Sequence, residues 1–272
     1  MTPPIATSAV FSRPATVIGH RGLGKGIVEG HVENTLGSFL AALDAGADWV
    51  EVDVRRTLDD RLFVAHDASY GSTLLTRLTA EEASRAGRLR IEELLEALPP
   101  QAGVAFDVKS SIEDANRTSA LTTAALLARV GRNTPWRRPV LALSFDPASL
   151  QHMREELPTL PLGLLTWLRF PVGHAVAAAA HLDVQVLAVH AGSLWPNAAT
   201  SHADVPALDE VVHHVHAANR QLMAWCPNRV QTKTLVAGGI DALVVDDVPR
   251  SVRTRSRVLG ADSPSKMSGL ID

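Results

Sequence analysis

The stretch that decides the fold begins with VIGHRG, passes through ENT and WVEVDV, and ends in LFVAHD (Val17–Gly22, Glu33–Thr35, Trp49–Val54 and Leu62–Asp67). Three of these pieces are apolar runs of strand-like composition, and each finishes in residues capable of acid–base or metal chemistry. Helical spacing of apolar residues after the ENT piece predicts a helix between the first two strands. Strand, helix and strand in succession predict a parallel sheet.

The same alternation continues to the end of the chain. Further strands are expected at 104–108, 140–145, 162–166, 186–190, 221–226 and 243–245, and helices at 79–86, 91–98, 112–130, 147–157, 172–181, 205–218, 229–237 and 249–259. Right-handed crossovers leave a closed barrel or an open doubly wound sheet. The count of about eight units in 272 residues favours a single (β/α)8 TIM barrel.

One domain accounts for most of the chain. We expect a loose, Pro/Ser/Thr-rich N-terminal arm over residues 1–15, the barrel over 16–260, and a flexible tail over 261–272. The segments Gly46–Asp53 and Gly239–Asp246 resemble each other, since in both a glycine ends a helix and an aspartate precedes a buried strand with an acidic end. This internal similarity agrees with a fold built from repeated strand–helix units.

Composition excludes several classes of protein. A net charge of −3 without blocks of like charge argues against a nucleic-acid surface. The single cysteine excludes an internal disulfide framework, and no apolar run approaches the roughly 20 residues of a membrane span. Residues 1–14 lack the pattern of a signal peptide. We therefore expect a cytoplasmic enzyme that acts on a small molecule.

Polar residues cluster where the predicted strands end. In a parallel barrel these ends open on one face, where active sites lie. The residues at these ends are His20, Arg21, Glu51, Asp53, His66, Asp67, Asp107, Lys109, Ser144, His190, Trp225, Asn228, Asp246 and Asp247.

Three of them are candidate metal ligands. Glu51 and Asp53 lie two apart on one strand, so their side chains point the same way, and Asp107 ends another strand. Neighbouring carboxylates need a cation or a shared proton, and Mg²⁺ and Ca²⁺ prefer oxygen ligands. The alternative is that Arg55 or Arg56 pairs with these carboxylates.

Two histidines are candidate catalysts. His20 and His66 each follow an apolar strand and precede a charged residue. A histidine pair beside a metal can supply the acid and the base for displacement at phosphorus, since its unperturbed pKa is near neutral. The alternative is that they are hydrogen-bonded residues of the barrel rim.

The remaining candidates would bind substrate. Arg21 and Lys109 could neutralise a phosphate, or they could pair with carboxylates inside the barrel. Trp225 could stack on an organic group of the substrate or simply pack. Cys226 has no base close in sequence and is expected to be inert. The glycine-rich loop after His20 has no Ser or Thr after Lys25, so it does not match a phosphate-binding P-loop, and it lacks the third glycine of a dinucleotide site.

These motifs closely resemble the glycerophosphodiester phosphodiesterase family, over residues 17–249. The matching pieces are His20-Arg21-Gly22, Glu33-Asn34-Thr35, Gly46-Ala47-Asp48, Glu51-Val52-Asp53-Val54, His66-Asp67, Ser144-Phe145-Asp146, Trp225-Cys226-Pro227-Asn228, Gly239-Ile240-Asp241-Ala242 and Asp246-Asp247.

The resemblance implies a (β/α)8 barrel with one divalent cation, Mg²⁺ or Ca²⁺, that hydrolyses glycerophosphodiesters to glycerol 3-phosphate and an alcohol. It implies that His20 and His66 are catalytic, that Glu51 and Asp53 bind the metal, and that Arg21 and Lys109 bind phosphate.

This sequence departs from the family's pattern in two places. The third metal ligand of the family is usually a glutamate in Glu-x-Lys, whereas Asp107-Val108-Lys109 stands here, which is similar to sphingomyelinase D-like phospholipases. The segment 68–97 is also short, which predicts a more open mouth. Phospholipase D-like activity on lysophospholipids or sphingolipids, a non-catalytic phosphate-binding barrel and a metal-dependent aldolase-type barrel are the alternatives.

Overall fold

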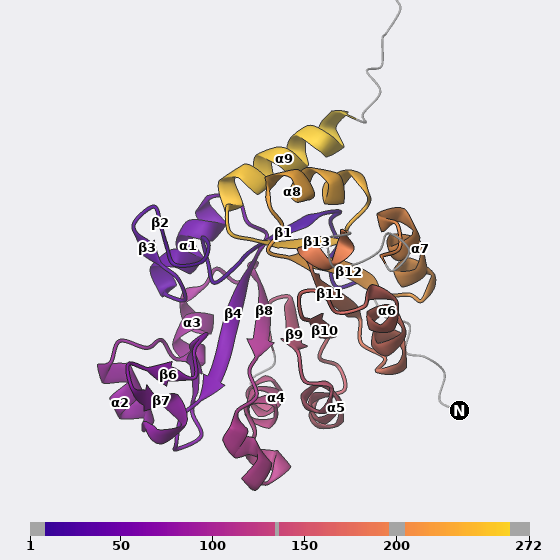
Figure 1. Ribbon diagram of the computed structural model, residues 1–272. Helices are drawn as coiled ribbons and strands as arrows, with labels where there is room; N and C mark the ends of the chain where they lie inside the picture. Colours follow the sequence, from indigo (N-terminus) through magenta and orange to yellow (C-terminus); the bar gives the residue numbers. More distant parts are fainter. Residues whose placement is uncertain (1–8, 134–135, 196–204, 262–272) are drawn as a thin grey trace, which may run out of the picture.

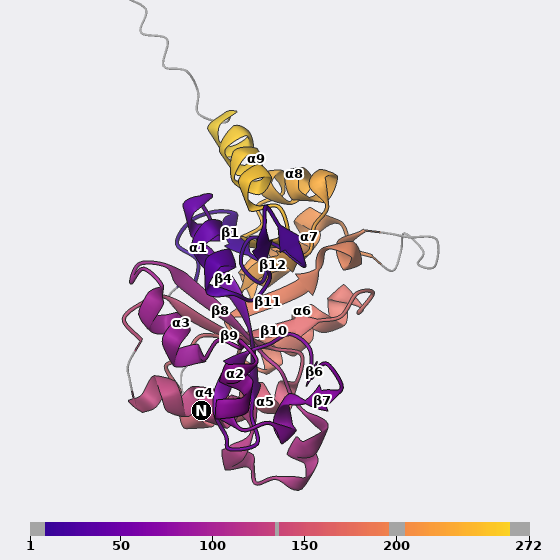
Figure 2. The ribbon, with the colours of Figure 1, turned by 90° about the vertical axis from the view of Figure 1, so that its left-hand side faces the viewer.

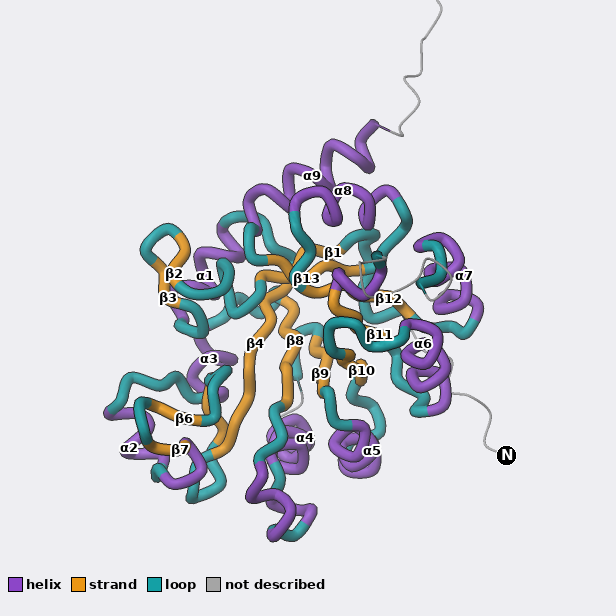
Figure 3. Tube along the Cα trace, viewed as in Figure 1, coloured by secondary structure: helices purple, strands orange, loops and turns teal. Residues whose placement is uncertain are grey.

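The computed structural model describes residues 9–133, 136–195 and 205–261. Its centre is a closed barrel of parallel strands surrounded by helices, as Figure 3 shows in orange and purple. The ring closes because β1 pairs with both β4 and β13. The barrel strands are β1 Thr16–Gly19, β4 Trp49–Arg56, β8 Gly103–Val108, β9 Val140–Ser144, β10 Leu162–Thr166, β11 Val186–His190, β12 Gln221–Trp225 and β13 Ala242–Val245. The predicted (β/α)8 TIM barrel is therefore confirmed.

Helices cover the outside of the barrel (Figure 1). They bury one apolar face against the strands, which keeps both surfaces of the parallel sheet away from water. Thr35 caps the first helix by accepting a hydrogen bond from the Ser38 amide. The helices are α1 Leu36–Asp44, α3 Ile91–Ala97, α4 Thr123–Asn133, α5 Pro147–Glu156, α6 Val172–His181, α7 Leu208–Ala217, α8 Arg229–Ala237 and α9 Val248–Ala261.

The amino-terminal end of the barrel is plugged by aromatic side chains. Trp49 and Phe11 contact each other edge to face, with ring centroids 5.4 Å apart. Gly103 makes room for them, since a Cβ at this position would lie 2.1 Å from the Trp49 ring. Phe11 and Ala15 of the expected N-terminal arm are buried, and Phe11 exchanges hydrogen bonds with Gln221, so these two residues pack on the barrel.

The similarity between the segments Gly46–Asp53 and Gly239–Asp246 is explained in part at this end of the barrel. Asp48, before β4, accepts a hydrogen bond from the Val17 amide of β1 at 2.9 Å. Asp241, before β13, accepts one from the Leu222 amide of β12 at 2.7 Å. Each aspartate thus accepts a hydrogen bond from an amide of the neighbouring strand, while the acidic ends of the two segments, Asp53 and Asp246, lie at the opposite end of the barrel.

One strand that was expected in the barrel ring lies outside it. Leu62–Val64 forms β5, which runs antiparallel to the far end of β4, so the run 62–65 is no barrel strand. Beyond it lie the hairpin of β6 Ser69–Tyr70 and β7 Thr73–Leu74, the turn η1 Leu75–Arg77 and the helix α2 Ala80–Arg85. Figures 1 and 2 show this small layer beside the end of β4.

The prediction of one long helix over residues 112–130 is wrong. The chain forms two short 3-10 turns, η2 Ile112–Asn116 and η3 Ser119–Leu121, before α4 begins at Thr123. The Thr122 hydroxyl donates to the Ser119 carbonyl and accepts from the Ala125 amide. Such local hydrogen bonds compete with a continuous helix and cap a new one.

Smaller elements complete the fold. The hairpin of β2 Ile27–Val28 and β3 His31–Val32 lies between β1 and α1, and η4 Ala191–Leu194 follows β11. The helix expected from 205 begins at Leu208. Arm residues 1–8 and tail residues 262–272 lie outside the described residues. Within the described ranges no helix is both long and apolar enough to cross a membrane.

Exchanging Gly103 for alanine should destabilise the fold by about 1–3 kcal/mol, because the new methyl group would overlap the Trp49 ring. Urea unfolding measures the change. The matched control is Gly173→Ala on α6, where a Cβ would meet no atom within 4 Å among the described residues. Equal unfolding midpoints for the two variants would contradict this account of the barrel plug.

Candidate active site

The carboxyl ends of the barrel strands surround a cavity of about 530 Å³. All eight residues that the sequence marks as site candidates line it, together with several apolar side chains from the barrel interior. Strand ends that are far apart in sequence meet here because the barrel is closed. The candidates are His20, Arg21, Glu51, Asp53, His66, Asp107, Lys109 and Trp225.

Three buried carboxylates form one wall of the cavity. Asp53 of β4 stands directly opposite Asp107 of β8 in the parallel ladder, and Glu51 precedes Asp53 on the same face of β4. One oxygen from each lies within 4.8 Å of the others. An all-oxygen donor set of this kind is what Mg²⁺ and Ca²⁺ prefer.

Two cations already neutralise part of this negative charge. The Lys109 ammonium contacts Asp107 and lies 2.8 Å from Asp53 Oδ1, and Arg21 Nε lies 3.4 Å from Asp53 Oδ2. The alternative pairing with Arg55 or Arg56 does not occur among the described residues. Arg56 binds Asp114 at 2.8 Å, and Arg55 donates to the His66 carbonyl.

The titration of the three carboxyls differs with their partners. Burial and the charge of Asp53 raise the pKa of Glu51 from 4.5 to about 8. Burial likewise raises the pKa of Asp107, although Lys109 opposes the shift. Burial would raise the pKa of Asp53 too, but Lys109, Asn34 and Arg21 outweigh it and lower that pKa. Glu51 therefore holds a proton near neutral pH that a further cation could replace.

The residues present fit a divalent cation. Asp107 Oδ1 is buried without a hydrogen-bond partner among the described residues, which leaves one carboxylate oxygen for a ligand. The Asn34 side-chain oxygen is orphaned in the same way, while its amide donates to Asp53 Oδ2 at 2.9 Å. Buried polar atoms are rarely left unpaired without a reason.

The loop after β1 places an arginine under this cluster. Arg21 has a φ of +52°, a left-handed conformation uncommon outside glycine, and its amide donates to Glu51 Oε2 at 2.9 Å. Its guanidinium also contacts Glu33 at 2.9 Å. Gly22 follows with a φ of +99°, where a Cβ would collide with Ser38. The backbone therefore turns sharply so that Arg21 reaches the carboxylates.

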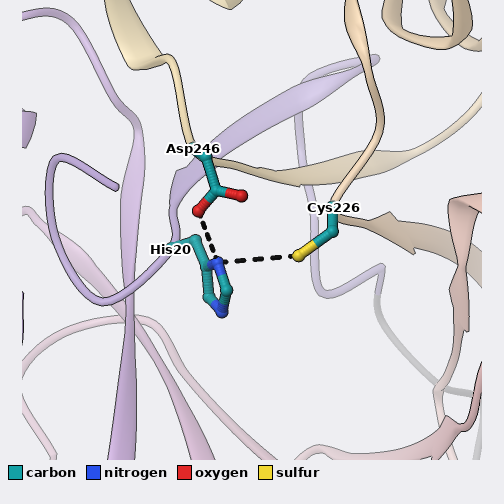
Figure 4. Close-up of side chains that lie close together, drawn as sticks. All are labelled: His20, Cys226 and Asp246. Atoms are coloured by element: carbon teal, nitrogen blue, oxygen red, sulfur yellow. Dashed lines mark hydrogen bonds and ion pairs between the residues drawn. The ribbon is translucent and has the colours of Figure 1, made fainter. Parts of the chain in front are cut away.

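His20 is fixed by an acidic partner. Its Nδ1 lies 2.7 Å from Asp246 Oδ1 and 3.6 Å from the Cys226 sulfur, as Figure 4 shows. Burial alone would lower the pKa of His20, but the hydrogen bonds to Asp246 and Cys226 and the charge of Glu51 raise it well above 6.5. Cys226, which has no base close in sequence, therefore has a histidine close in space.

His66 reaches the cavity from the antiparallel strand rather than from the ring. The amide of Ala65 donates to the Asp53 carbonyl at 3.0 Å, which brings the end of β5 level with the carboxylates. The His66 Nδ1 lies 2.8 Å from the exposed carboxylate of Asp67. The two histidines thus lie at different strand ends, and each has its own acidic partner.

Aromatic side chains also line the cavity. Phe145 stacks on Trp167 with ring centroids 3.8 Å apart and contacts Trp225 edge to face at 5.9 Å. Trp225 also packs edge to face on His190. Trp167 remains 62% exposed at the mouth. The cavity is therefore lined both by charged groups and by aromatic rings.

Sequence reasoning assigns no role to some residues of the site. Asp246 is separated from His20 by 226 positions, and only the β1–β13 pairing brings them together. Glu33 and Asn34 belong to a recognisable motif, but their contacts with Arg21 and Asp53 depend on the loop conformation. Trp167 carries no strand-end signal, since it follows β10 among other apolar residues.

Comparison with known proteins agrees with this arrangement. The model of the glycerophosphoryl diester phosphodiesterase family matches residues 20–250. A glycerophosphodiester phosphodiesterase of Bacillus altitudinis is 26% identical over 264 residues, which cover 89% of this chain and 98% of that protein. One from Caldanaerobacter subterraneus is 24% identical, over 85% of this chain and 93% of that protein.

Solved structures have the same fold. A glycerophosphodiester phosphodiesterase of Thermotoga maritima has a TM-score of 0.69 at 20% identity, covering 89% of this chain and 98% of its own. A phosphodiesterase of Oleispira antarctica, solved with the product sn-glycerol-3-phosphate, has a TM-score of 0.71 at 20% identity, covering 92% and 100%. The chain belongs to the glycerophosphoryl diester phosphodiesterase family and is a phosphoric diester hydrolase.

Proposed function

We propose that this enzyme hydrolyses glycerophosphodiesters to glycerol 3-phosphate and an alcohol, using a divalent cation and two histidines. The observation that carries the proposal is the cavity itself, where three carboxylates, two cationic side chains and two histidines converge. The Oleispira antarctica relative binds sn-glycerol-3-phosphate, the product expected here. Charge and acid–base groups of this kind are what displacement at phosphorus requires.

The cation would be held by Glu51, Asp53 and Asp107. When bound, it would polarise a phosphate oxygen and draw negative charge away from the reacting phosphorus. Both Mg²⁺ and Ca²⁺ accept this hard-oxygen donor set. Lys109 contacts two of these carboxylates, so its ammonium would compete with the ion for their oxygens.

Arg21 and Lys109 would bind the phosphate. Both are nearly buried beside the carboxylates, and burial strengthens their attraction for an anion. A Lys109 displaced from the carboxylates would face the cavity, which it lines. The charge that develops in the transition state would then lie between two fixed positive groups.

His20 and His66 would transfer the protons. The histidine held by Asp246 has a raised pKa, which suits an imidazolium that protonates the leaving oxygen. The more exposed His66 would then activate the attacking water or hydroxyl group. Asp67 at its Nδ1 leaves Nε2 free for that role. This division of the acid and base roles is part of the proposal.

The variants His20→Gln and His66→Gln should each lower kcat by at least about 100-fold, because a proton transfer is lost while the cavity stays intact. Release of glycerol 3-phosphate from glycerophosphocholine gives the rate, and circular dichroism checks the fold. The matched control is His216→Gln, because His216 lies on the outer helix α7 and pairs with Asp241. Near-wild-type rates in both cavity variants would exclude this mechanism.

Binding of Mg²⁺ should tighten as pH rises from about 6 to about 9 and then level off. The pKa of Glu51 is raised to about 8, so its proton must leave before the ion can bind, and this cost disappears above that pH. Titration calorimetry in buffers of different ionisation heat measures the affinity and the proton release. Glu51→Gln should flatten the pH dependence. An affinity that does not change with pH would contradict the assignment.

Lysophospholipids are a second candidate class of substrate. Trp167, Leu168 and Phe170 lie close together on the loop after β10, and Trp167 and Leu168 are 62% and 50% exposed. Trp167 also lines the cavity. The acyl chain of a bound lysophospholipid could extend out of the cavity and cover these apolar side chains, which would remove them from water.

If so, Trp167→Ala should lower kcat/KM for lysophosphatidylcholine about tenfold relative to glycerophosphocholine, because the lost apolar contact is worth about 1.4 kcal/mol or more. Parallel assays of the two substrates give this ratio. Leu58→Ala removes a similarly exposed side chain in the turn between β4 and β5 and should leave the ratio unchanged. An unchanged ratio in Trp167→Ala would restrict the enzyme to water-soluble diesters.

A further inference from the structure

A second cluster of potential metal ligands lies beside the carboxylates. The His20 Nδ1, the Cys226 sulfur and an Asp246 carboxylate oxygen all lie within 4.8 Å of one another (Figure 4). One is nitrogen, one sulfur and one oxygen, whereas the carboxylate cluster offers only oxygen. Soft and borderline donors of this kind select Zn²⁺ over Mg²⁺ or Ca²⁺.

The barrel holds these three residues together. They follow the neighbouring strands β1, β12 and β13 at the same end of the ring. The His20 amide donates to the Val245 carbonyl at 3.0 Å, and the Cys226 amide donates to the Val244 carbonyl at 2.9 Å. The spacing of the ligand atoms is therefore set by the sheet and not by mobile side chains alone.

The distances suit a tetrahedral ion. Zinc bond lengths of about 2.3 Å to sulfur and about 2.0 Å to nitrogen place those atoms about 3.5 Å apart across a tetrahedral angle. His20 Nδ1 and the Cys226 sulfur are 3.6 Å apart. The Asp246 oxygen, at 2.7 Å from Nδ1, is at hydrogen-bond distance and would have to move outward. Its side chain is 45% exposed, which leaves room for that movement.

We propose that His20, Cys226 and Asp246 form a binding site for a thiophilic divalent cation such as Zn²⁺, separate from the cluster of Glu51, Asp53 and Asp107. The ion would replace the proton shared by His20 and Asp246 and the thiol proton of Cys226, and a water would complete its coordination. An ion on Nδ1 prevents His20 from keeping its partnership with Asp246. Binding should therefore inhibit hydrolysis, a consequence that rests on the proposed role of His20, whereas the binding itself does not.

The chain makes a direct test possible because Cys226 is its single cysteine. The full-length protein is saturated with Mg²⁺ and titrated with Cd²⁺, and thiolate-to-cadmium charge-transfer absorption is recorded. We expect a band that saturates at one ion per chain. Cys226→Ser should abolish it, and Asp246→Asn should raise the apparent Kd at least about tenfold. His216→Asn, in a histidine–aspartate pair without a thiol, should leave the titration unchanged.

A parallel titration follows hydrolysis of glycerophosphocholine with Zn²⁺ at saturating Mg²⁺. Inhibition should follow the saturation of the site, reverse with a chelator and require at least about tenfold more Zn²⁺ in Cys226→Ser. Absence of the cadmium band would overturn the site, and so would a band of equal affinity in Asp246→Asn, because the carboxylate would then contribute nothing to binding. If the wild type shows the expected cadmium band but zinc inhibits the wild type and Cys226→Ser equally, the site would stand and its inhibitory role would be overturned.

Discussion

Three carboxylates buried at one end of a closed barrel are the constraint on which this site depends. The pairing of β4 with β8 places Asp53 and Asp107 side by side, and Glu51 shares their face. Three ionised carboxyls in a dry interior repel one another and lose their hydration. Lys109, Arg21 and a proton on Glu51 offset this charge, and a divalent cation could take the place of that proton.

The surroundings of the cluster follow from the same requirement. The loop after β1 adopts a left-handed conformation at Arg21 so that both its amide and its guanidinium face the carboxylates. Asn34, also left-handed, donates to Asp53 from the next turn. Side chains at the neighbouring strand ends are free to serve the site, because the rest of the barrel and its helices provide the stability of the fold.

Strand ends are predictable from this sequence, whereas contacts between distant segments are not. Apolar runs with acidic endings identify β4 and β8, so the residue pattern alone groups Glu51, Asp53 and Asp107. The antiparallel direction of β5 is invisible in the sequence, because an apolar run of that length carries no sign of its pairing. The partnership of His20 with Asp246 and Cys226 exists only because the last strand closes on the first.

The central claim is that Glu51, Asp53 and Asp107 together bind a divalent cation. Anomalous diffraction from crystals soaked in Mn²⁺ tests it most directly. The account predicts one anomalous peak at about 2.2 Å from an oxygen of each of the three carboxylates, with the Lys109 ammonium moved away from at least one of them. Crystals that show no peak at this position, with Lys109 still bound to both Asp53 and Asp107, would contradict it.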